Sequence, residues 1–243
     1  MEEASLLLKD ESFSMDKLEK FRIKGAFNTL YYVPDFINNR EEEQLLRNIY
    51  SAPKPKWTQL NNRRLQNWGG YPTTKGMIEE PIPEWLKQVM KRIDDLNIFG
   101  GKQSNHVLVN EYLPGQGIMP HLDGPLFFPT ITTINLKSHA VLDYYVEEEH
   151  KDIRQETKMT RTKLASILLF PRSLLVVKDE FYQKYLHGIE EQKEDEVNPN
   201  LLNWDSLPEE IKSRTITRGT RVSVTIRHVP HTRRINISSL CRR

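Results

Sequence analysis

GIMPHLDGPLFFPTITTINL, residues 117–136, places a histidine and an aspartate two positions apart, directly before a run of β-branched residues. Alternate residues of a strand point to the same face of a sheet, so His121 and Asp123 would project into one space. Imidazole and carboxylate groups both bind metal ions, and we predict that this space holds a metal. The alternative is that His121 is a hydrogen-bonded loop histidine, because H-x-D is a weak motif when it stands alone.

A second histidine ends another strand-like run. In LLVVKDEFYQKYLHGIEE, residues 174–191, His187 lies directly before Gly188. Two histidines and one carboxylate form a facial triad that leaves three positions of an octahedral Fe(II) open for oxygen activation. His121, Asp123 and His187 supply these ligand types. The other histidines lack a nearby paired carboxylate or lie in charged or basic segments: His106, His139, His150, His228 and His231.

The last predicted strand carries two arginines on one face. In RGTRVSVTIRHV, residues 218–229, Arg221 and Arg227 share a face with Ser223 and Thr225. The two arginines lie about 20 Å apart, at roughly 3.3 Å per residue. Buried guanidinium groups need anionic partners, and a dicarboxylate that chelates the metal would satisfy one of them. The alternative is an exposed edge strand with solvated arginines.

Six segments from residue 105 onward are rich in strand-forming residues and are bounded by Gly, Pro or charged turns. They are HVLVNEYL, TITTINL, AVLDYYV, ASILLF, SLLVVKD and TRVSVTIRHV. So many short strands in about 125 residues predict a jelly roll or a sandwich rather than a parallel α/β sheet. The predicted fold class is therefore α+β and mainly β.

Two helices are predicted upstream of these strands. FINNREEEQLLRNIY, residues 36–50, has Asn39 as its predicted N-cap, glutamates in the first turn, and an apolar stripe of Leu45, Leu46 and Ile49. PIPEWLKQVMKRIDDLNIFGG, residues 81–101, keeps apolar residues at helical spacing and stops at Gly100–Gly101. Both helices are predicted to be part of the scaffold.

Two charged insertions interrupt the predicted strands. EEEHKDIRQETKMTRTK covers residues 147–163, and EEQKEDEVNPNLLNWDSLPEEIKSR covers residues 190–214. Charge runs of this kind are typical of solvated, mobile loops, and we predict such loops for both insertions.

The composition fits a soluble globular protein, with 37% hydrophobic and 28% charged residues in a chain of 243. The net charge is +2, from 35 basic and 33 acidic residues, so no global charge indicates nucleic-acid binding. One cysteine, Cys241, excludes an intramolecular disulfide and fits a reducing compartment. No apolar stretch approaches the roughly 20 residues that span a bilayer, and the acidic N-terminus does not resemble a signal peptide. We expect a monomer in the cytoplasm or the nucleus, with no membrane partner.

The ordered motifs are similar to those of the AlkB family of Fe(II)/2-oxoglutarate-dependent dioxygenases. The matching positions are Asn110 and Tyr112 in N-x-Y, His121 and Asp123 in H-x-D, then His187, and then the R-x-S-x-T stretch from Arg221 to Arg227. The resemblance covers about residues 105–229 and extends upstream through RLQNWGG, where it is greatest to the branch known as the sixth AlkB homologue. It implies a double-stranded β-helix, or jelly roll, supported by N-terminal helices.

The resemblance also implies a role for each motif. Fe(II) would be bound by His121, Asp123 and His187. Arg221 would hold the distal carboxylate of 2-oxoglutarate. Tyr112 would lie beside it, Asn110 near the metal-chelating end, and Arg227 behind Asp123. Ser223 departs from the family, whose bacterial prototype has an asparagine there that helps to bind the cosubstrate.

In the family, O2 cleaves 2-oxoglutarate to succinate and carbon dioxide while a substrate C–H bond is hydroxylated. Members that act on nucleic acid carry a lid before the core, here at about residues 54–76. KPKWTQLNNRRLQNWGGYPTTKG offers Trp68, Tyr71 and Trp57 for base stacking and Arg63, Arg64 and Lys75 for phosphates. The alternative is that these aromatic side chains pack against the core and the arginines are solvated.

We therefore expect one structural domain of about 230 residues. It would consist of helices and lid (1–104), the dioxygenase core (105–229) and a basic tail (230–243). The leading functional hypothesis is oxidative demethylation or hydroxylation of an alkylated base in DNA or RNA, single-stranded or with the base flipped out. The alternatives are a protein side-chain hydroxylase or demethylase, and a non-catalytic module that binds metal and 2-oxoglutarate.

Overall fold

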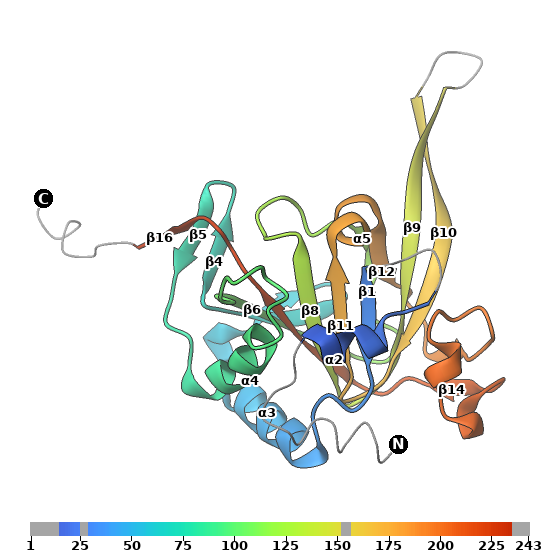
Figure 1. Ribbon diagram of the computed structural model, residues 1–243, viewed down its shortest axis with the longest axis horizontal. Coiled ribbons are helices and arrows are strands. Elements are labelled where there is room, and N and C mark those ends of the chain that lie inside the picture. Colours follow the sequence, from blue (N-terminus) through green and yellow to red (C-terminus); the bar gives the residue numbers. More distant parts are fainter. Residues whose placement is uncertain (1–14, 25–28, 152–156, 235–243) are drawn as a thin grey trace, which may run out of the picture.

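The computed structural model describes residues 15–24, 29–151 and 157–234, and two antiparallel sheets form its centre (Figure 1). The large sheet has the order β1-β11-β8-β15-β6-β3-β2, and the small sheet has the order β10-β9-β12-β7. The large sheet consists of β1 (Leu30–Val33), β11 (Leu174–Lys178), β8 (Thr130–Leu136), β15 (Arg221–Arg227), β6 (His106–Tyr112), β3 (Arg63–Trp68) and β2 (Thr58–Leu60). The small sheet consists of β10 (Thr157–Leu169), β9 (Ala140–Lys151), β12 (Leu186–Ile189) and β7 (Ile118–His121).

Each of the six segments predicted as strands contributes a strand to these two sheets, which confirms the mainly β jelly roll. The further elements include α2 (Met15–Leu18), η1 (Glu19–Phe21) and α5 (Asp179–Lys184). Within the described residues, no helix has the length and apolarity needed to cross a membrane. The N-terminal residues 1–14, Cys241 and the tail beyond residue 234 lie outside the part of the chain that the structure describes.

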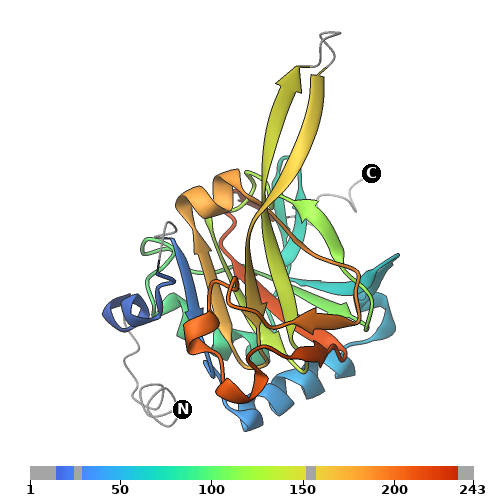
Figure 2. The ribbon, with the colours of Figure 1, turned by 90° about the vertical axis from the view of Figure 1, so that its right-hand side faces the viewer.

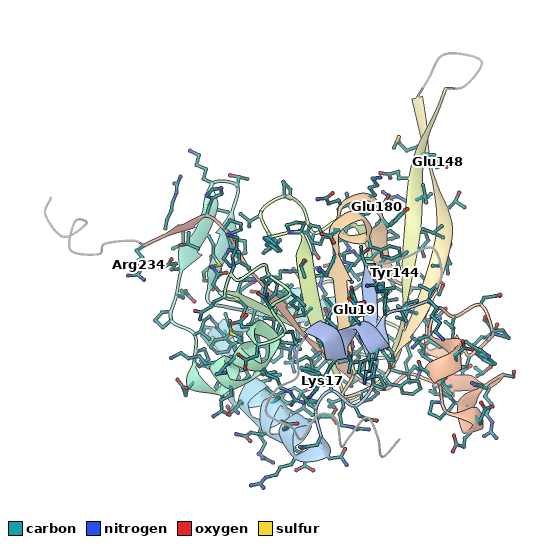
Figure 3. The ribbon with its side chains drawn as sticks, viewed as in Figure 1. Lys17, Glu19, Tyr144, Glu148, Glu180 and Arg234 are labelled. Carbon is teal, nitrogen blue, oxygen red and sulfur yellow. The ribbon has the colours of Figure 1, made fainter. Side chains whose placement is uncertain are left out.

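Side-chain alternation along the large sheet creates two separate hydrophobic cores. On one face, residues such as Val109, Val176 and Val224 pack with the helices. On the other face, residues such as Tyr112 and Val177 pack with Tyr144 and other side chains of the small sheet. Figure 3 shows Tyr144 in the interior, where 1% of its surface is exposed. Polar side chains on this second face are therefore enclosed between the two sheets.

Helices α3 (Asn39–Ser51) and α4 (Glu84–Asp94) cover the outer face of the large sheet. The N-cap of α3 is Asn38, not Asn39 as predicted. Asn38 has an extended backbone and forms a capping box with Glu41, in which each side chain bonds the other residue's backbone N–H. Helix α4 ends at Asp94, before the predicted stop at Gly100–Gly101, and the chain continues to the glycines in turns.

The last strand lies in the middle of the large sheet, so the alternative of an exposed edge strand is wrong. Strand β15 pairs with β6 on one side and with β8 on the other, and all seven of its residues are buried. Arg221 and Arg227 are 5% and 6% exposed. The structure therefore requires a partner for each buried guanidinium group.

The first charged insertion is not a loop where the structure describes it. Strands β9 and β10 continue their pairing through it and form a ribbon that projects beyond both sheets (Figure 2). Glu147 lies opposite Arg161 in the register, and the two side chains form an ion pair of 2.9 Å. Opposite charges across a strand pair, together with β-branched threonines, stabilise a ribbon that composition alone assigns to a loop. Residues 152–156, between the two strands in the sequence, lie outside the described residues.

The second charged insertion is also structured. It contains β13 (Glu194–Glu196), η3 (Trp204–Ser206), η4 (Glu209–Ile211) and β14 (Thr215–Thr217). Val197, Leu201 and Leu207 form a small core with Leu168 of β10. Asp195 is fully buried in this segment. The prediction of a solvated loop failed because a few apolar residues, spaced between the charges, are enough to anchor the segment on the small sheet.

The predicted lid segment forms η2 (Lys54–Lys56), β2, β3 and β4 (Gly70–Thr73), and the chain then enters β5 (Gly76–Glu79). Strand β3 joins the large sheet beside β6. Strands β4, β5 and β16 (Thr232–Arg233) form a separate three-stranded sheet. Figure 1 shows β4 and β5 on one side of the molecule and the β9–β10 ribbon on the other, with α5 at the same end between them.

Candidate metal centre

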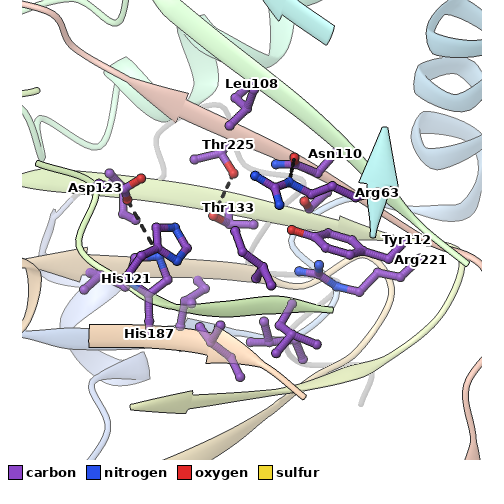
Figure 4. A pocket seen from close by; sticks show the side chains of 18 of the residues that line it. Arg63, Leu108, Asn110, Tyr112, His121, Asp123, Thr133, His187, Arg221 and Thr225 are labelled. Carbon is purple, nitrogen blue, oxygen red and sulfur yellow. Dashed lines mark hydrogen bonds and ion pairs between the residues drawn. The ribbon is translucent and has the colours of Figure 1, made fainter. Parts of the chain in front are cut away.

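The predicted triad meets at one end of the space between the sheets (Figure 4). His121 of β7 lies directly opposite His187 of β12 in the strand register, and their ring centroids are 4.5 Å apart. Asp123 follows β7, and its Oδ2 lies 3.9 Å from Nε2 of His187. One ligand atom from each of the three residues lies within 4.8 Å of the others, so the cluster could hold a metal ion.

A β-bulge in β7 sets the orientation of His121. Between the pairs His187–His121 and Ile189–Ile118, β7 contains one more residue than β12. The ring Nδ1 of His121 lies 2.9 Å from the carbonyl oxygen of Met119 in this bulge. A carbonyl only accepts hydrogen bonds, so Nδ1 carries the proton and Nε2 is left as the metal-binding atom.

Gly188 allows β12 to approach β7 this closely. A Cβ at this position would lie 2.9 Å from the carbonyl oxygen of Ile118 and 3.0 Å from the nitrogen of Pro120. The glycine after His187 in the sequence is therefore needed for the close strand contact that brings the two histidines together.

One carboxylate oxygen of Asp123 accepts a hydrogen bond, and the other has no hydrogen-bond partner among the described residues. Nη2 of Arg227 donates to Oδ1 of Asp123 at 2.5 Å, and both side chains are 8% exposed. Oδ2 is buried and accepts no hydrogen bond from the described residues. Burial favours a higher pKa for Asp123, but the charge of Arg227, with smaller effects of His187 and His121, lowers the pKa below its usual value. The carboxylate is therefore ionised, and Oδ2 is available to a cation.

His187 has the protonation state that a metal ligand needs. Burial lowers its pKa to about 4, although Asp123 opposes the shift. The imidazole is therefore neutral at pH 7 and can donate a lone pair to a metal. The donor set and the free Oδ2 atom fit a metal ion of the Fe(II) type.

A cavity of about 260 Å³ extends from the triad between the two sheets. All the residues predicted to bind a cosubstrate line this one cavity: Asn110, Tyr112, Arg221, Ser223 and Arg227. Arg227 lies at the metal end because it bonds Asp123. Figure 4 shows Asn110, Tyr112 and Arg221 at the opposite end, together with Arg63, so Asn110 does not lie near the metal end as the sequence predicts.

Arg221 is buried without a carboxylate partner among the described residues. Its Nη2 donates to Oδ1 of Asn135 at 2.6 Å, and its Nε has no hydrogen-bond partner. The guanidinium carbon lies 5.6 Å from the ring centroid of Tyr112. Burial lowers the pKa of Arg221 to about 10, so the side chain is still charged at pH 7. A buried, unpaired cation with a free donor fits the carboxylate of a ligand.

Sequence reasoning missed two residues that position this site. Asn135, within TITTINL, lies opposite Ser223 and holds Arg221; the signal is a polar amide between Ile134 and Leu136 in a predicted strand. Tyr182 of α5 lines the cavity and donates to the carbonyl oxygen of Gly124 at 2.6 Å, directly after Asp123. No local pattern indicates the role of Tyr182, because the contact joins segments 58 residues apart.

The strand register divides the predicted lid residues between the two faces of the large sheet. Trp68 packs edge-on against Trp85 of α4 at 5.6 Å and donates to Gln66, on the face opposite the cavity. Trp57 stacks on Tyr50 of α3 and packs on the same outer core. Both rings are therefore partly buried against the scaffold, on the face of the sheet opposite the cavity.

The basic residues of the segment are divided in the same way. Arg64 faces the helices, where it pairs with the buried Glu111 at 2.6 Å and lies over the Trp57 ring at 4.2 Å. Arg63, one residue earlier, lines the cavity instead. Lys75 is exposed, and Tyr71 is 48% exposed on β4. Of the six predicted substrate contacts, Tyr71 and Lys75 are thus the ones displayed at the surface.

Comparisons with known proteins agree with this geometry. A family model described as the 2OG-Fe(II) oxygenase superfamily matches residues 29–227. The chain is 51% identical over 222 residues to a Danio rerio protein named Probable RNA/DNA demethylase ALKBH6, and the match covers 90% of this chain and 94% of that protein. It is 27% identical to the Mus musculus tRNA (carboxymethyluridine(34)-5-O)-methyltransferase ALKBH8, over 82% of this chain and 30% of that protein. The solved structure of OsALKBH1 superposes with a TM-score of 0.50 at 14% identity, covering 82% of this chain and 96% of that chain, and therefore shares the fold.

Proposed function

Because the chain belongs to the 2OG-Fe(II) oxygenase superfamily and within it to the AlkB-like family, we propose that it oxidises an alkylated base in DNA or RNA. Membership of this family shows the enzyme class, an Fe(II)- and 2-oxoglutarate-dependent dioxygenase. The nucleic-acid substrate is supported above all by the relative with 51% identity over nearly the whole chain, which carries the name of an RNA/DNA demethylase.

We propose that Nε2 of His121, Oδ2 of Asp123 and Nε2 of His187 bind the iron. When bound, Fe(II) with 2-oxoglutarate and O2 supplies the oxidant that inserts one oxygen atom into a substrate C–H bond. If the carbon is an N-methyl group, the hydroxymethyl product releases formaldehyde and leaves the free base.

The contribution of the protein is orientation and charge. Met119 fixes the ring of His121, and Arg227 fixes Asp123. We propose that Arg221 and Tyr112 bind the distal carboxylate of 2-oxoglutarate, that Asn110 contacts the cosubstrate, and that Ser223 lines its path. The buried guanidinium of Arg221 then gains the anion that it lacks among the described residues.

The size and position of the cavity favour a base that has left the stack. The triad lies in a cavity of about 260 Å³ between two sheets, which is too small for a duplex, so a base has to leave the stack to reach it. The exposed Tyr71 and Lys75 lie on or beside the β4–β5 hairpin, at the end of the molecule where α5 and the β9–β10 ribbon also lie (Figure 1). We propose that Tyr71 stacks on the nucleic acid and that Lys75 contacts its backbone.

The test is succinate formation with Fe(II), 2-oxoglutarate and ascorbate, in the presence of methylated or unmethylated single-stranded oligonucleotides of the same sequence. Methylated oligonucleotides are expected to stimulate turnover at least about tenfold and to lose the methyl group, whereas His187→Ala should abolish turnover. Tyr71→Ala should lower the stimulation, and Tyr71→Phe, which keeps the ring, should retain it. Stimulation by methylated peptides instead of oligonucleotides would assign a protein substrate.

A further inference from the structure

Two arginines converge on the end of the cavity that lies away from the metal triad. Arg221 enters from β15 in the middle of the large sheet, and Arg63 enters from β3 near its edge. Figure 4 shows both guanidinium groups directed into the cavity on either side of Tyr112. Nε of Arg63 donates to Oδ1 of Asn110 at 3.2 Å, on the strand paired with β3.

The charges at the two ends of the cavity are not balanced in the same way. At the metal end, Arg227 is paired with Asp123. At the other end, neither Arg63 nor Arg221 forms an ion pair with a carboxylate of the described residues, while Arg64 next to Arg63 is paired with Glu111. Burial raises the pKa of Tyr112, and the charges of Arg221 and Arg63 both oppose that shift, which indicates that both cations lie within electrostatic reach of the phenol.

Two neighbouring cations without a counter-charge are unfavourable unless a ligand brings one. A carboxylate has two oxygens that can accept about four hydrogen bonds, enough for two guanidinium groups and a phenol. The side chain of Arg63 is partly exposed but lines the cavity between the sheets, as Arg221 does, so one anion bound in this cavity could meet both guanidinium groups.

We propose that Arg63 is a second cosubstrate-binding arginine, which closes over the distal carboxylate of 2-oxoglutarate from the β2–β3 hairpin while Arg221 binds it from the centre of the sheet. This role differs from the phosphate contact that the sequence predicts for Arg63. It requires the dioxygenase class but not a nucleic-acid substrate, so it is testable without any oligonucleotide. It also makes the β2–β3 hairpin part of the cosubstrate site.

The experiment compares two ligands that differ only in the distal carboxylate, 2-oxoglutarate and 2-oxopentanoate. Their affinities are measured by calorimetry with the full chain loaded with Mn(II), which binds without turnover. Arg63→Ala should weaken 2-oxoglutarate binding about tenfold, the effect of one charged hydrogen bond, and should leave 2-oxopentanoate binding within about twofold. Arg63→Lys, which keeps the charge but loses the forked geometry, should fall between the wild type and Arg63→Ala.

Arg64→Gln is the matched control, because Arg64 lies on the same hairpin but faces the opposite side of the sheet. It should lower thermal stability and leave both affinities within about twofold of the wild type. A second readout is amide hydrogen exchange of residues 58–68, which should slow on addition of 2-oxoglutarate in the wild type but not in Arg63→Ala.

An equal loss of affinity for both ligands in Arg63→Ala would overturn the proposal, because it would show a general effect on the cavity. Unchanged 2-oxoglutarate affinity together with weaker oligonucleotide binding would also overturn it and would return Arg63 to the phosphate role. Failure of oligonucleotides to stimulate turnover would contradict the proposed function but would not change these ligand affinities.

Discussion

Arg218 and Arg221 lie three residues apart, are equally buried, and have opposite electrostatic surroundings. Arg218 forms two hydrogen bonds of 2.6 Å with the fully buried Asp195, and its Nη1 donates to the carbonyl oxygen of Glu190 at 2.7 Å. Asp195 is also bonded by Gln192, and His139 lies 3.3 Å from it. Arg221 has one hydrogen bond, to an amide, and no carboxylate among the described residues.

The difference distinguishes a structural ion pair from a ligand site. Both arginines carry the same desolvation cost, which an ion pair inside the protein offsets for Arg218. Arg221 has an amide and an aromatic ring as neighbours but no carboxylate among the described residues. On our proposal, the rest of its desolvation cost is offset when an anionic ligand binds in the cavity. The hydrogen bonds between Arg218 and Asp195 anchor the second insertion on the sheets, whereas Arg221 is the residue that we propose binds the cosubstrate.

The largest expected effect on ligand binding follows from removing the unpaired cation, Arg221. Arg221→Met should weaken 2-oxoglutarate binding by at least about 100-fold, since more than one charged hydrogen bond is lost. The thermal midpoint should stay the same or rise, because an uncompensated buried charge is removed. Calorimetry with Mn(II)-loaded protein and a thermal melt measure the two quantities. A lower midpoint with full affinity would show that Arg221 is a structural residue like Arg218.

For Arg218, the paired cation, we expect the opposite result, a loss of stability without a loss of ligand affinity. Arg218→Met leaves Asp195 buried and unpaired, which should cost about 3–5 kcal/mol of unfolding free energy and about 10 °C in the thermal midpoint. The affinity of the folded variant for 2-oxoglutarate should remain within about twofold. Adding Asp195→Leu to Arg218→Met should restore most of the midpoint. If the double variant is no more stable than the single one, the pair is not the source of the loss.

Metal binding should distinguish His187, in the triad, from His139, which lies beside Asp195. Mn(II) at about 100 times its dissociation constant should stabilise the wild type by about 2.7 kcal/mol, and EDTA should reverse the effect. His187→Ala should remove this metal-dependent shift, because one ligand of the triad is lost. His139→Ala should lower the midpoint without metal yet keep the shift. A shift that persists in His187→Ala would place the metal elsewhere.

The smallest expected effect is on pH dependence. Although burial alone favours a higher pKa, the hydrogen bonds of Arg218, together with the nearby His139, hold the pKa of Asp195 well below its usual range. A carboxyl group whose pKa is lower in the folded state contributes stability above its unfolded pKa, near 4, and loses that contribution as the pH falls further. Urea midpoints of the wild type should therefore fall between pH 5 and pH 2. Asp195→Asn should be less stable at pH 7 and show a shallower fall, and an equal slope in both proteins would contradict the pairing.

Much of the fold and of the triad could be predicted from local patterns. The β-branched segments gave the strands, and the spacing of His121 and Asp123 before TITTINL indicated that two ligands share one space. The alternation in RVSVTIR placed Arg221 and Arg227 on one face. These features follow from the spacing of residues along a strand, which can be read directly from the sequence.

The insertions and the lid residues could not be predicted in this way. Charge runs predicted loops at 147–163 and 190–214, but cross-strand pairs in one and a few anchored apolar residues in the other produced regular structure. Trp68 and Arg64 belong to a basic and aromatic segment that composition assigns to a lid, yet the register of β3 against β6 turns them toward the helices and turns Arg63 toward the cavity.

The order of the residues alone shows which of them alternate, which can bind a metal, and that two arginines share a strand face. The burial of this face, and the neutralisation of one arginine but not the other, follow from the tertiary fold. The carboxylate that pairs with Arg227 comes from a residue 104 positions away, and the one that pairs with Arg218 comes from 23 positions away. Periodicity is local, whereas charge compensation depends on which distant segments the fold brings within a few ångströms, and at Arg221 the fold brings none of the described carboxylates.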